Sequence, residues 1–243
     1  MVEYKKEESY LLLSEDFYSL QAEGKFLGVP SYFIRTTGCN CRCSWLNSDG
    51  SITKCDTSYT SWEPDVGYKT TFGELLNKVR QTKAKHVVIT GGEPFLQKGL
   101  VDIANNFIKN KYNVTIETNG TLYFDWLNRG IFMSISPKLL SANALKNELH
   151  EKNNKWIETT RKLMTNYSYQ LKFVYNNKKD EEEIENILNI LPATGKNVYI
   201  MPQGISVLSL KEKSQEIWKM CCEHGWNMSP RLHIDVFGNI KGI

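Results

Sequence analysis

The chain has 243 residues, of which 41% are hydrophobic and 12% aromatic, which is enough for one well-buried domain and excludes a disordered chain. The formal net charge of +3, from 30 basic and 27 acidic residues, argues against a dedicated nucleic-acid or membrane-surface protein. No apolar run reaches the roughly 18 residues of a membrane span, and the N-terminal segment lacks the features of a signal peptide. We therefore expect a cytoplasmic protein with one domain over 1–243 that binds neither nucleic acid nor a membrane.

Short apolar strands alternate with amphipathic helical stretches along most of the chain. Seven strands are predicted, at 31–35, 86–90, 114–118, 132–136, 170–175, 197–202 and 231–236. Strands that alternate with helices of this length are typical of βαβ units and a parallel sheet. For a chain of this length, the pattern favours an α/β fold of the incomplete (β/α) barrel kind, with about six to seven parallel strands.

Helix-start and helix-stop signals separate the strands. Thr71 and Ser209 each stand three residues before a glutamate, which is the spacing of a capping box. A helix over 211–224 is expected to end before the glycine that follows it. This helix carries Cys221 and Cys222, which we expect to be small buried apolar side chains.

Polar or glycine-rich clusters follow five of the predicted strands, at 39–43, 91–94, 117–120, 136–138 and 203. Ligands of parallel α/β folds bind at the carboxyl ends of the strands. The pattern therefore predicts one large site on one rim of the sheet. Two stretches are expected to be irregular, over 40–68 and 138–155.

Four of the six cysteines, Cys39, Cys41, Cys43 and Cys55, fall within 17 residues. In a reducing compartment such a cluster indicates metal or redox chemistry more than disulfides. Thiolates suit zinc or iron–sulfur clusters, but the C-x-x-C pairs that zinc sites favour are absent from the sequence. Cys39 and Cys43 form a C-x-x-x-C pair, and Cys55 could be a third ligand after a looped insertion. A four-cysteine zinc site remains the alternative.

The C-x-x-x-C pair after the first predicted strand, followed by Gly-Gly-Glu-Pro after the next, resembles the radical S-adenosylmethionine (SAM) superfamily. In that superfamily three cysteines bind a [4Fe–4S] cluster, and SAM chelates the fourth iron. The usual spacing is C-x-x-x-C-x-x-C, whereas eleven residues separate Cys43 from Cys55. An insertion over 45–54 would produce this spacing and leave Cys41 as a spare. The resemblance thus implies a radical SAM barrel with an enlarged cluster loop at about 39–68.

Further motifs are similar to those of the 7-carboxy-7-deazaguanine synthase family. They are Leu-Gln-Ala-Glu-Gly at 20–24, F-x-R-x-x-G-C at 33–39, Cys-Asp-Thr at 55–57, Glu-Thr-Asn-Gly-Thr at 117–121, Ser-Pro-Lys at 136–138 and the terminal Gly-Ile. That family converts 6-carboxy-5,6,7,8-tetrahydropterin to 7-carboxy-7-deazaguanine, a radical-mediated ring contraction with loss of ammonia on the way to queuosine-type bases. The resemblance implies a radical SAM lyase that uses a [4Fe–4S] cluster, SAM and Mg²⁺.

The resemblance also implies roles for individual residues. Cluster ligands would be Cys39, Cys43 and Cys55, and the Mg²⁺ ligand would be Thr57. The residues expected at the cofactor are Lys54, Asp56, Gly91, Gly92, Glu93, Glu117, Asn119, Ser136, Pro137, Lys138 and Gln203. The residues expected at the substrate are Leu20, Gln21, Ala22, Glu23, Arg35, Thr90, His233 and Ile243.

The chemistry gives reasons for several of these assignments. Gly91 and Gly92 would let the backbone approach the methionine moiety closely, and Glu93 would accept a hydrogen bond from its ammonium group. Arg35 precedes the cysteine cluster, and a guanidinium can bind the substrate carboxylate through two parallel hydrogen bonds. His233 could contact the substrate or only pack in the last predicted strand.

The expected partners are the pterin substrate, a flavodoxin- or ferredoxin-type electron donor and a second copy of the chain in a homodimer. One alternative is a radical-generating activase that acts on a glycine of a partner protein, but it leaves 20–24, Cys-Asp-Thr and the terminal Gly-Ile unexplained. The other is a zinc-stabilised binding module. Whether Cys41 helps to assemble the cluster or is a bystander stays open.

Overall fold

A mixed sheet forms the centre of the computed structural model, which describes residues 8–147 and 156–243. Its nine strands lie in the order β11-β10-β9-β8-β7-β6-β2-β1-β5. They are β1 (Tyr10–Leu20), β2 (Pro30–Thr36), β5 (Tyr68–Thr71), β6 (His86–Gly91), β7 (Asn113–Thr118), β8 (Phe132–Ile135), β9 (Ser168–Tyr175), β10 (Val198–Pro202) and β11 (Asn227–Met228). From β2 to β11 all neighbours pair in parallel, whereas β1 and β5 extend the sheet in antiparallel orientation.

Six of the seven predicted strands are confirmed, and the one expected at 231–236 is wrong. That segment forms the short helix α8 (Leu232–Phe237), and β11 is the last parallel strand instead. The apolar alternation of 232–236 fits a strand, but in the helix Ile234 is buried while Val236 and Phe237 are exposed. The strand β1 was not predicted, because its sequence mixes three consecutive leucines with acidic residues and so lacks a clear period.

Among the described residues, five longer helices connect the strands: α2 (Phe72–Arg80), α3 (Leu100–Lys109), α5 (Trp156–Asn166), α6 (Lys179–Ile190) and α7 (Val207–His224). The predicted capping box at Thr71 is confirmed, since its hydroxyl accepts from the Glu74 amide at 3.4 Å. The box expected at Ser209 is wrong. Ser206 caps α7, and Ser209 is the third residue inside the helix.

The C-terminal end of α7 follows the prediction, because Gly225 has the left-handed φ of +67° that suits a glycine after a helix. Cys221 is buried as expected, but Cys222 is exposed. Adjacent residues of an α-helix point about 100° apart, so only one of the two can face the sheet.

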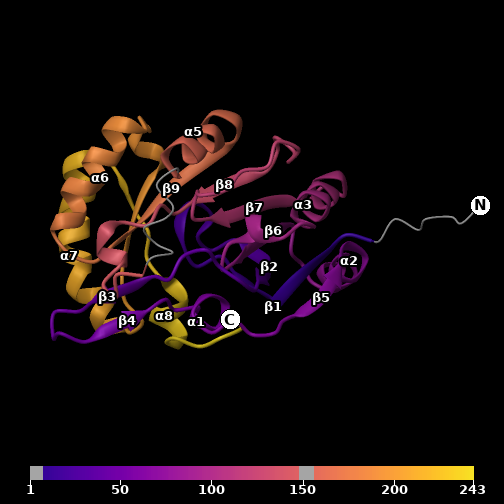
Figure 1. Ribbon diagram of the computed structural model, residues 1–243, viewed down its shortest axis with the longest axis horizontal. Coiled ribbons are helices and arrows are strands. Elements are labelled where there is room, and N and C mark those ends of the chain that lie inside the picture. Colours follow the sequence, from indigo (N-terminus) through magenta and orange to yellow (C-terminus); the bar gives the residue numbers. More distant parts are fainter. Residues whose placement is uncertain (1–7, 148–155) are drawn as a thin grey trace, which may run out of the picture.

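The longer helices lie around the outer side of the sheet (Figure 1). Their apolar side chains pack against those of the strands, and the fully buried core includes Leu75, Phe107, Leu163, Ile184 and Ile217. Burial of each such side chain contributes about 1.5–3 kcal/mol. This face of the sheet carries the hydrophobic core, so the opposite face is left for polar groups.

Alternation along the strands sets which residues reach the second face. On β6, β7 and β9, the core residues Ile89, Ile116 and Leu171 are each followed by a polar residue. Successive side chains of a strand point to opposite faces, so Thr90, Glu117 and Lys172 face away from the core.

Short elements gather on that side of the sheet. The hairpin of β3 (Ser44–Leu46) and β4 (Ile52–Lys54) lies there with α1 (Ser58–Ser61), α8 and the C-terminus (Figure 1). The short 3-10 helices are Gly24–Phe26, Pro94–Leu96, Leu140–Ala142 and Gly195–Asn197. The irregular stretch expected at 138–155 thus contains one such turn, and 148–155 lies outside the described residues. None of the described helices has the length and apolar character needed to cross a membrane.

Candidate active site

A cavity of about 460 Å³ opens at the carboxyl ends of the parallel strands. Most of the sequence-predicted site residues line it: Leu20, Gln21, Ala22, Glu23, Arg35, Cys39, Cys43, Lys54, Cys55, Asp56, Thr57, Thr90, Gly91, Gly92, Glu117, Asn119, Ser136, Lys138, Gln203, His233 and Ile243. Glu93 and Pro137 do not. The motifs scattered over the sequence therefore meet at one rim of the sheet, as the strand-end pattern predicted.

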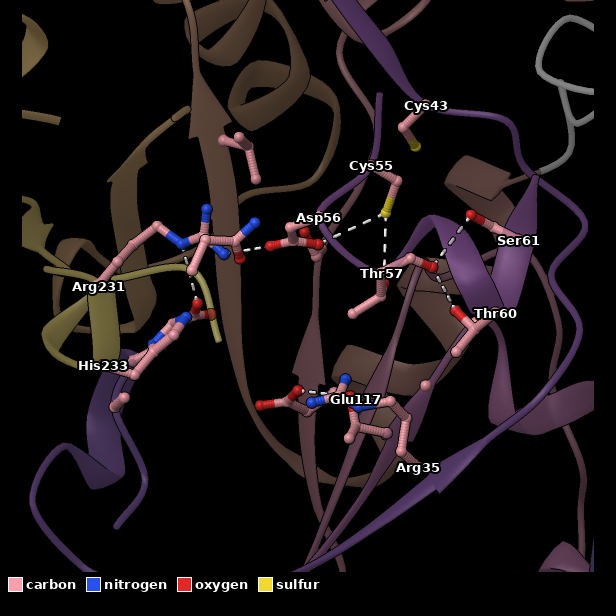
Figure 2. Close-up of a pocket in the computed structure, with 18 of the residues that line it drawn as sticks. Arg35, Cys43, Cys55, Asp56, Thr57, Thr60, Ser61, Glu117, Arg231 and His233 are labelled. Carbon is pink, nitrogen blue, oxygen red and sulfur yellow. Dashed lines mark hydrogen bonds and ion pairs between the residues drawn. The ribbon is translucent and has the colours of Figure 1, made fainter. Parts of the chain in front are cut away.

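The hairpin explains how distant cysteines come together. Ser44 pairs with Lys54 in its register, so the residues on either side of it become neighbours. The Cys55 amide donates to the Cys43 carbonyl at 3.1 Å. Eleven intervening residues thus leave Cys43 and Cys55 adjacent in space, in place of the usual C-x-x-C spacing. Both thiols face the cavity from the same side (Figure 2).

Cys39 and Cys41 lie on the loop that follows β2 and also line the cavity. The Cys41 amide donates to the Cys39 sulfur at 3.3 Å, and the hydrogen bond between the two thiols lowers the pKa of Cys39. The Asn119 side chain contacts the Cys41 sulfur at 3.6 Å and the Asn40 oxygen at 2.8 Å. Asn119, expected at the cofactor, therefore holds the cysteine loop while it lines the cavity.

The thiols share their surroundings with one lysine. Burial raises the pKa of Cys55 to about 11, and burial also raises that of Cys43. Burial alone would lower the pKa of Lys138, but attraction to the four cysteines in their ionised, thiolate form outweighs it and raises the pKa. The Lys138 ammonium also donates to the Ser136 hydroxyl at 3.1 Å. This is a soft donor set facing a fixed cation, which suits an anionic iron–sulfur cluster.

The described part of the chain contains no three Cys, His, Asp or Glu side chains close enough to hold a single metal ion. A structural zinc needs four ligands at about 2.0–2.3 Å from one centre. The described residues therefore do not form such a zinc site, although Cys39, Cys41, Cys43 and Cys55 all line the same cavity.

Contacts within the chain explain why glycines stand at the end of β6, where Gly91 is the last residue of the strand and Gly92 follows it. A Cβ atom on Gly92 would lie 2.0 Å from the Gly38 carbonyl oxygen and 2.9 Å from the Cys39 Cβ. One on Gly91, which has a φ of +129°, would lie 2.2 Å from the Thr36 oxygen. The sequence analysis expected these glycines to let the backbone approach a ligand closely. In the structure, the glycines let the end of β6 touch the cysteine loop.

Glu93 and Pro137 depart from the expected roles. The Glu93 carboxylate is fully buried and accepts from the Thr118 hydroxyl at 2.9 Å and the Asn119 amide at 2.8 Å. It joins the ends of β6 and β7 and does not reach the cavity, and burial raises its pKa. Pro137 is buried behind the rim. The ammonium contact expected for Glu93 therefore stays a prediction, while these hydrogen bonds hold its carboxylate at the strand ends.

Arg35 lies on β2 and projects into the cavity from the sheet (Figure 2). Its Nε donates to Glu15 at 2.6 Å, and Tyr59 donates to the same Glu15 oxygen at 2.8 Å. Attraction to Tyr59 and Glu15 outweighs the effect of burial and raises the pKa of Arg35. Glu15 escaped prediction because its strand, β1, was not predicted.

A second group of charges lines the cavity near α8. Glu23 pairs with Lys172 of β9 and with Arg231, and Arg231 also pairs with Asp56 (Figure 2). Burial would raise the pKa of Glu23, but attraction to Lys172 and Arg231 lowers it to about 2. The sequence analysis assigned no role to Lys172 or Arg231. The lysine in the apolar strand Leu-Lys-Phe-Val could have indicated a buried ion pair, because buried charges need partners.

Polar groups from three neighbouring segments meet around Glu117. Gln21 donates to one Glu117 oxygen at 3.2 Å, and Thr90 donates to the other at 2.7 Å. His233 lies across the cavity on α8, rather than on the expected strand. Its Nδ1 is buried and has no hydrogen-bond partner among the described residues, and burial lowers the pKa of the ring. Such an atom suits a ligand group, because buried polar atoms are normally paired.

The remaining expected residues complete the walls. The Thr57 hydroxyl lies 3.4 Å from the Cys55 sulfur, at the start of α1. The Gln203 side chain accepts from Lys213 at 3.3 Å, and the Lys54 ammonium stacks 4.9 Å from the Trp62 ring centre. Ile243, the last residue, lines the cavity opening.

Comparison with known proteins gives a consistent result. Residues 33–201 match the model of the radical SAM superfamily. A 7-carboxy-7-deazaguanine synthase of Rhodopirellula baltica is 37% identical over 97% of this chain and 90% of its own length. The protein of the same name from Halobacterium salinarum is 34% identical, over 94% and 91%. The crystal structure of QueE from Escherichia coli has the same fold, with a TM-score of 0.65 at 22% identity, covering 92% of this chain and 95% of that one.

Proposed function

This chain belongs to the radical SAM superfamily and, within it, to the 7-carboxy-7-deazaguanine synthase family, and we propose that it carries out its reaction in the cavity described above. It is a radical SAM enzyme that forms 7-carboxy-7-deazaguanine in queuosine biosynthesis, with a [4Fe–4S] cluster, SAM and a pterin-derived substrate. When bound, the cluster and SAM supply the radical that starts the reaction. The chain's own residues bind the two ligands, orient them and exclude water.

The substrate in this proposal is 6-carboxy-5,6,7,8-tetrahydropterin, whose ring contracts with loss of ammonia. The observation that carries the proposal is the division of one cavity into a thiol-lined end and a charged end (Figure 2). Cys39, Cys43 and Cys55 hold the cluster at the first end, facing Lys138. The second end holds the pterin.

The charged end matches the groups of a carboxylated pterin. Glu15 occupies only the Nε of Arg35, and the described residues give its terminal nitrogens no hydrogen-bond partner, so they are available to the substrate carboxylate. Glu117 accepts the N–H groups of the pterin edge, with Gln21 and Thr90 fixing its oxygens. The unpaired Nδ1 of His233 meets a polar group of the same ligand.

SAM occupies the space between these two ends. The residues that line it from the strand ends are Gly91, Gly92, Asn119, Ser136, Lys138 and Gln203, with Lys54 and Asp56 on the hairpin side. Leu20, Ala22, Glu23 and Ile243 close the substrate side. Glycine backbone and short polar side chains suit a ligand with its own amino, carboxylate and ribose groups, since they leave room and supply hydrogen bonds.

Thr57 is the proposed protein ligand of Mg²⁺. Its hydroxyl faces the cavity beside Cys55, and the carboxylate of the preceding residue, Asp56, is already paired with Arg231. Magnesium prefers oxygen ligands and keeps several waters or substrate oxygens, so a single hydroxyl with the substrate carboxylate satisfies its requirements.

The decisive experiment is an anaerobic incubation of reconstituted protein with dithionite, SAM and carboxytetrahydropterin. We expect 7-carboxy-7-deazaguanine by mass and absorbance, and omission of SAM should abolish it. Cleavage of SAM without this product would contradict the substrate assignment.

Assembly and electron supply form the rest of the proposal. Tyr18, Leu20, Val236 and Phe237 are exposed apolar side chains around a second depression beside the cavity, and we propose that a second copy covers them in a homodimer. A flavodoxin- or ferredoxin-type protein supplies the single electron, in the cytoplasm, where thiols stay reduced. We further propose that the chain is one domain over 1–243 and that its seven parallel strands belong to an incomplete barrel.

A further inference from the structure

A continuous set of contacts runs from Arg35 to the C-terminal tail. Arg35 Nε donates to Glu15 Oε1 at 2.6 Å, and the Tyr59 hydroxyl donates to the same oxygen at 2.8 Å. The Lys241 ammonium lies 4.0 Å from the centre of the Tyr59 ring. All four side chains line the cavity. Each contact joins a different segment of the chain: β1 to β2, then to α1, then to the tail that ends at Ile243.

Glu15 reaches this place because of an irregularity in β1. Its register with β2 shifts between Leu13 and Glu15, so one extra residue is inserted there. Leu11 and Leu13 lie in the hydrophobic core, whereas Glu15 and Phe17, at the same alternation, line the cavity. In a regular strand all four would share one face. The bulge therefore turns Glu15 toward the cavity, and bulges of this kind re-aim side chains beside active sites.

The contacts on Glu15 restrict how Arg35 can point. Glu15 lies directly opposite Arg35 in the β1–β2 pairing, so their side chains stand on one face. Both side chains are largely buried, at 13% and 18% exposed. An arginine held by Nε presents its two terminal nitrogens in a fixed plane, which is the arrangement that binds a carboxylate by two parallel hydrogen bonds.

We propose that Glu15 is a positioning residue for substrate recognition, which fixes Arg35 for the substrate carboxylate and, through Tyr59 and Lys241, ties that position to the C-terminal tail. This rests on the proposed role of Arg35. If Glu15 only neutralised the charge of Arg35, removal of the Glu15 charge would tighten substrate binding, because it would strengthen the attraction between Arg35 and a carboxylate.

The test compares Glu15→Ala, Glu15→Gln and wild type by equilibrium binding of two probes, 6-carboxypterin and pterin without the carboxylate. We expect Glu15→Ala to weaken 6-carboxypterin binding about tenfold, as for the loss of one hydrogen bond to a charged group, and to leave pterin binding unchanged. Glu15→Gln keeps an acceptor for Nε and should recover most of the affinity. In turnover, KM for the substrate should rise while kcat changes little.

Two further variants follow the contacts outward. Tyr59→Phe removes the hydroxyl but keeps the ring, and Lys241→Met removes the cation, and both should weaken 6-carboxypterin binding less than Glu15→Ala does. The matched control is Asp16→Asn on the same strand, whose carboxylate contacts Tyr32, Tyr68 and Lys78 away from the cavity. It should bind both probes as wild type does.

Three results would overturn the inference. They are tighter 6-carboxypterin binding by Glu15→Gln, equal losses for both probes in Glu15→Ala, and wild-type binding by Lys241→Met. Iron content and the thermal unfolding midpoint of each variant show whether that variant is folded. If Glu15→Ala fails to fold, the binding of the two probes by Glu15→Gln decides the question. If wild type makes no deazaguanine product, the proposed function fails by itself, whatever the binding of the two probes shows.

Discussion

Substitution of Gly92 by alanine tests how the strand end supports the cluster loop. The new Cβ would lie 2.0 Å from the Gly38 carbonyl oxygen, whereas real Cβ contacts are essentially never below 3.0 Å. The loop that carries Cys39 must therefore move by about 1 Å. Overpacking of this kind costs about 1–3 kcal/mol of unfolding free energy, and a displacement of about 1 Å at a site is enough to reduce its function about a hundredfold.

We expect Gly92→Ala to lose most of its cluster. The assay is iron and sulfide per chain after anaerobic reconstitution, with about four of each for wild type. The thermal unfolding midpoint is measured in parallel.

Gly99→Ala is the matched control. Its Cβ would lie 2.2 Å from the Tyr10 carbonyl oxygen, and Gly99, like Gly92, has an ordinary backbone conformation. This collision lies where α3 meets β1, outside the residues that line the cavity. Gly99→Ala should lower stability by a similar amount and keep its iron. Full iron in Gly92→Ala, or an equal loss in Gly99→Ala, would refute the reasoning.

Three further predictions concern the metal sites. Cys55→Ser should lose the cluster, whereas Cys41→Ser should keep full iron and activity, and a loss of iron in the latter would make Cys41 a participant in assembly. Deletion of 46–54 should keep the iron, because it restores a C-x-x-C spacing between cysteines whose backbones already form a hydrogen bond, from the Cys55 amide to the Cys43 carbonyl at 3.1 Å. A colourless product would show that the hairpin is needed. Thr57→Ala should abolish Mg²⁺ stimulation and leave the cluster spectrum intact, and unchanged Mg²⁺ dependence would remove Thr57 as the ligand.

One prediction concerns pH. The pKa of Cys55 is raised to about 11, and that of Cys43 is raised as well, so both thiols are protonated at neutral pH before the cluster is loaded. Cluster ligands must be thiolates, so loading releases protons and is favoured as pH rises. Reconstitution at about pH 8.5 should therefore give more iron per chain than at about pH 7. Equal loading would show that deprotonation of these thiols does not limit assembly.

The strands were predictable where local pattern and environment agree. The six correctly predicted strands are covered by the helices and are therefore rich in apolar residues, which a local sequence pattern can detect. The segment 231–236 has the same alternation but forms α8, and the short strand β11 lies at that edge of the sheet. The strand β1 is present but was not predicted. Its bulge changes which face is buried halfway along the strand, so its apolar residues follow no single period.

The chemical groups at the site could be identified from the amino-acid sequence. The motifs resembled those of one family and so implied a cluster, and the polar strand ends predicted one rim, because parallel strands place their carboxyl ends together. The pairing of the charged side chains could not be predicted and is known from the folded chain. Glu23 meets Lys172 and Arg231 across 149 and 208 positions, and Glu15 meets Arg35 through a bulge. Such pairs depend on strand order and register, and a local pattern carries no information about either.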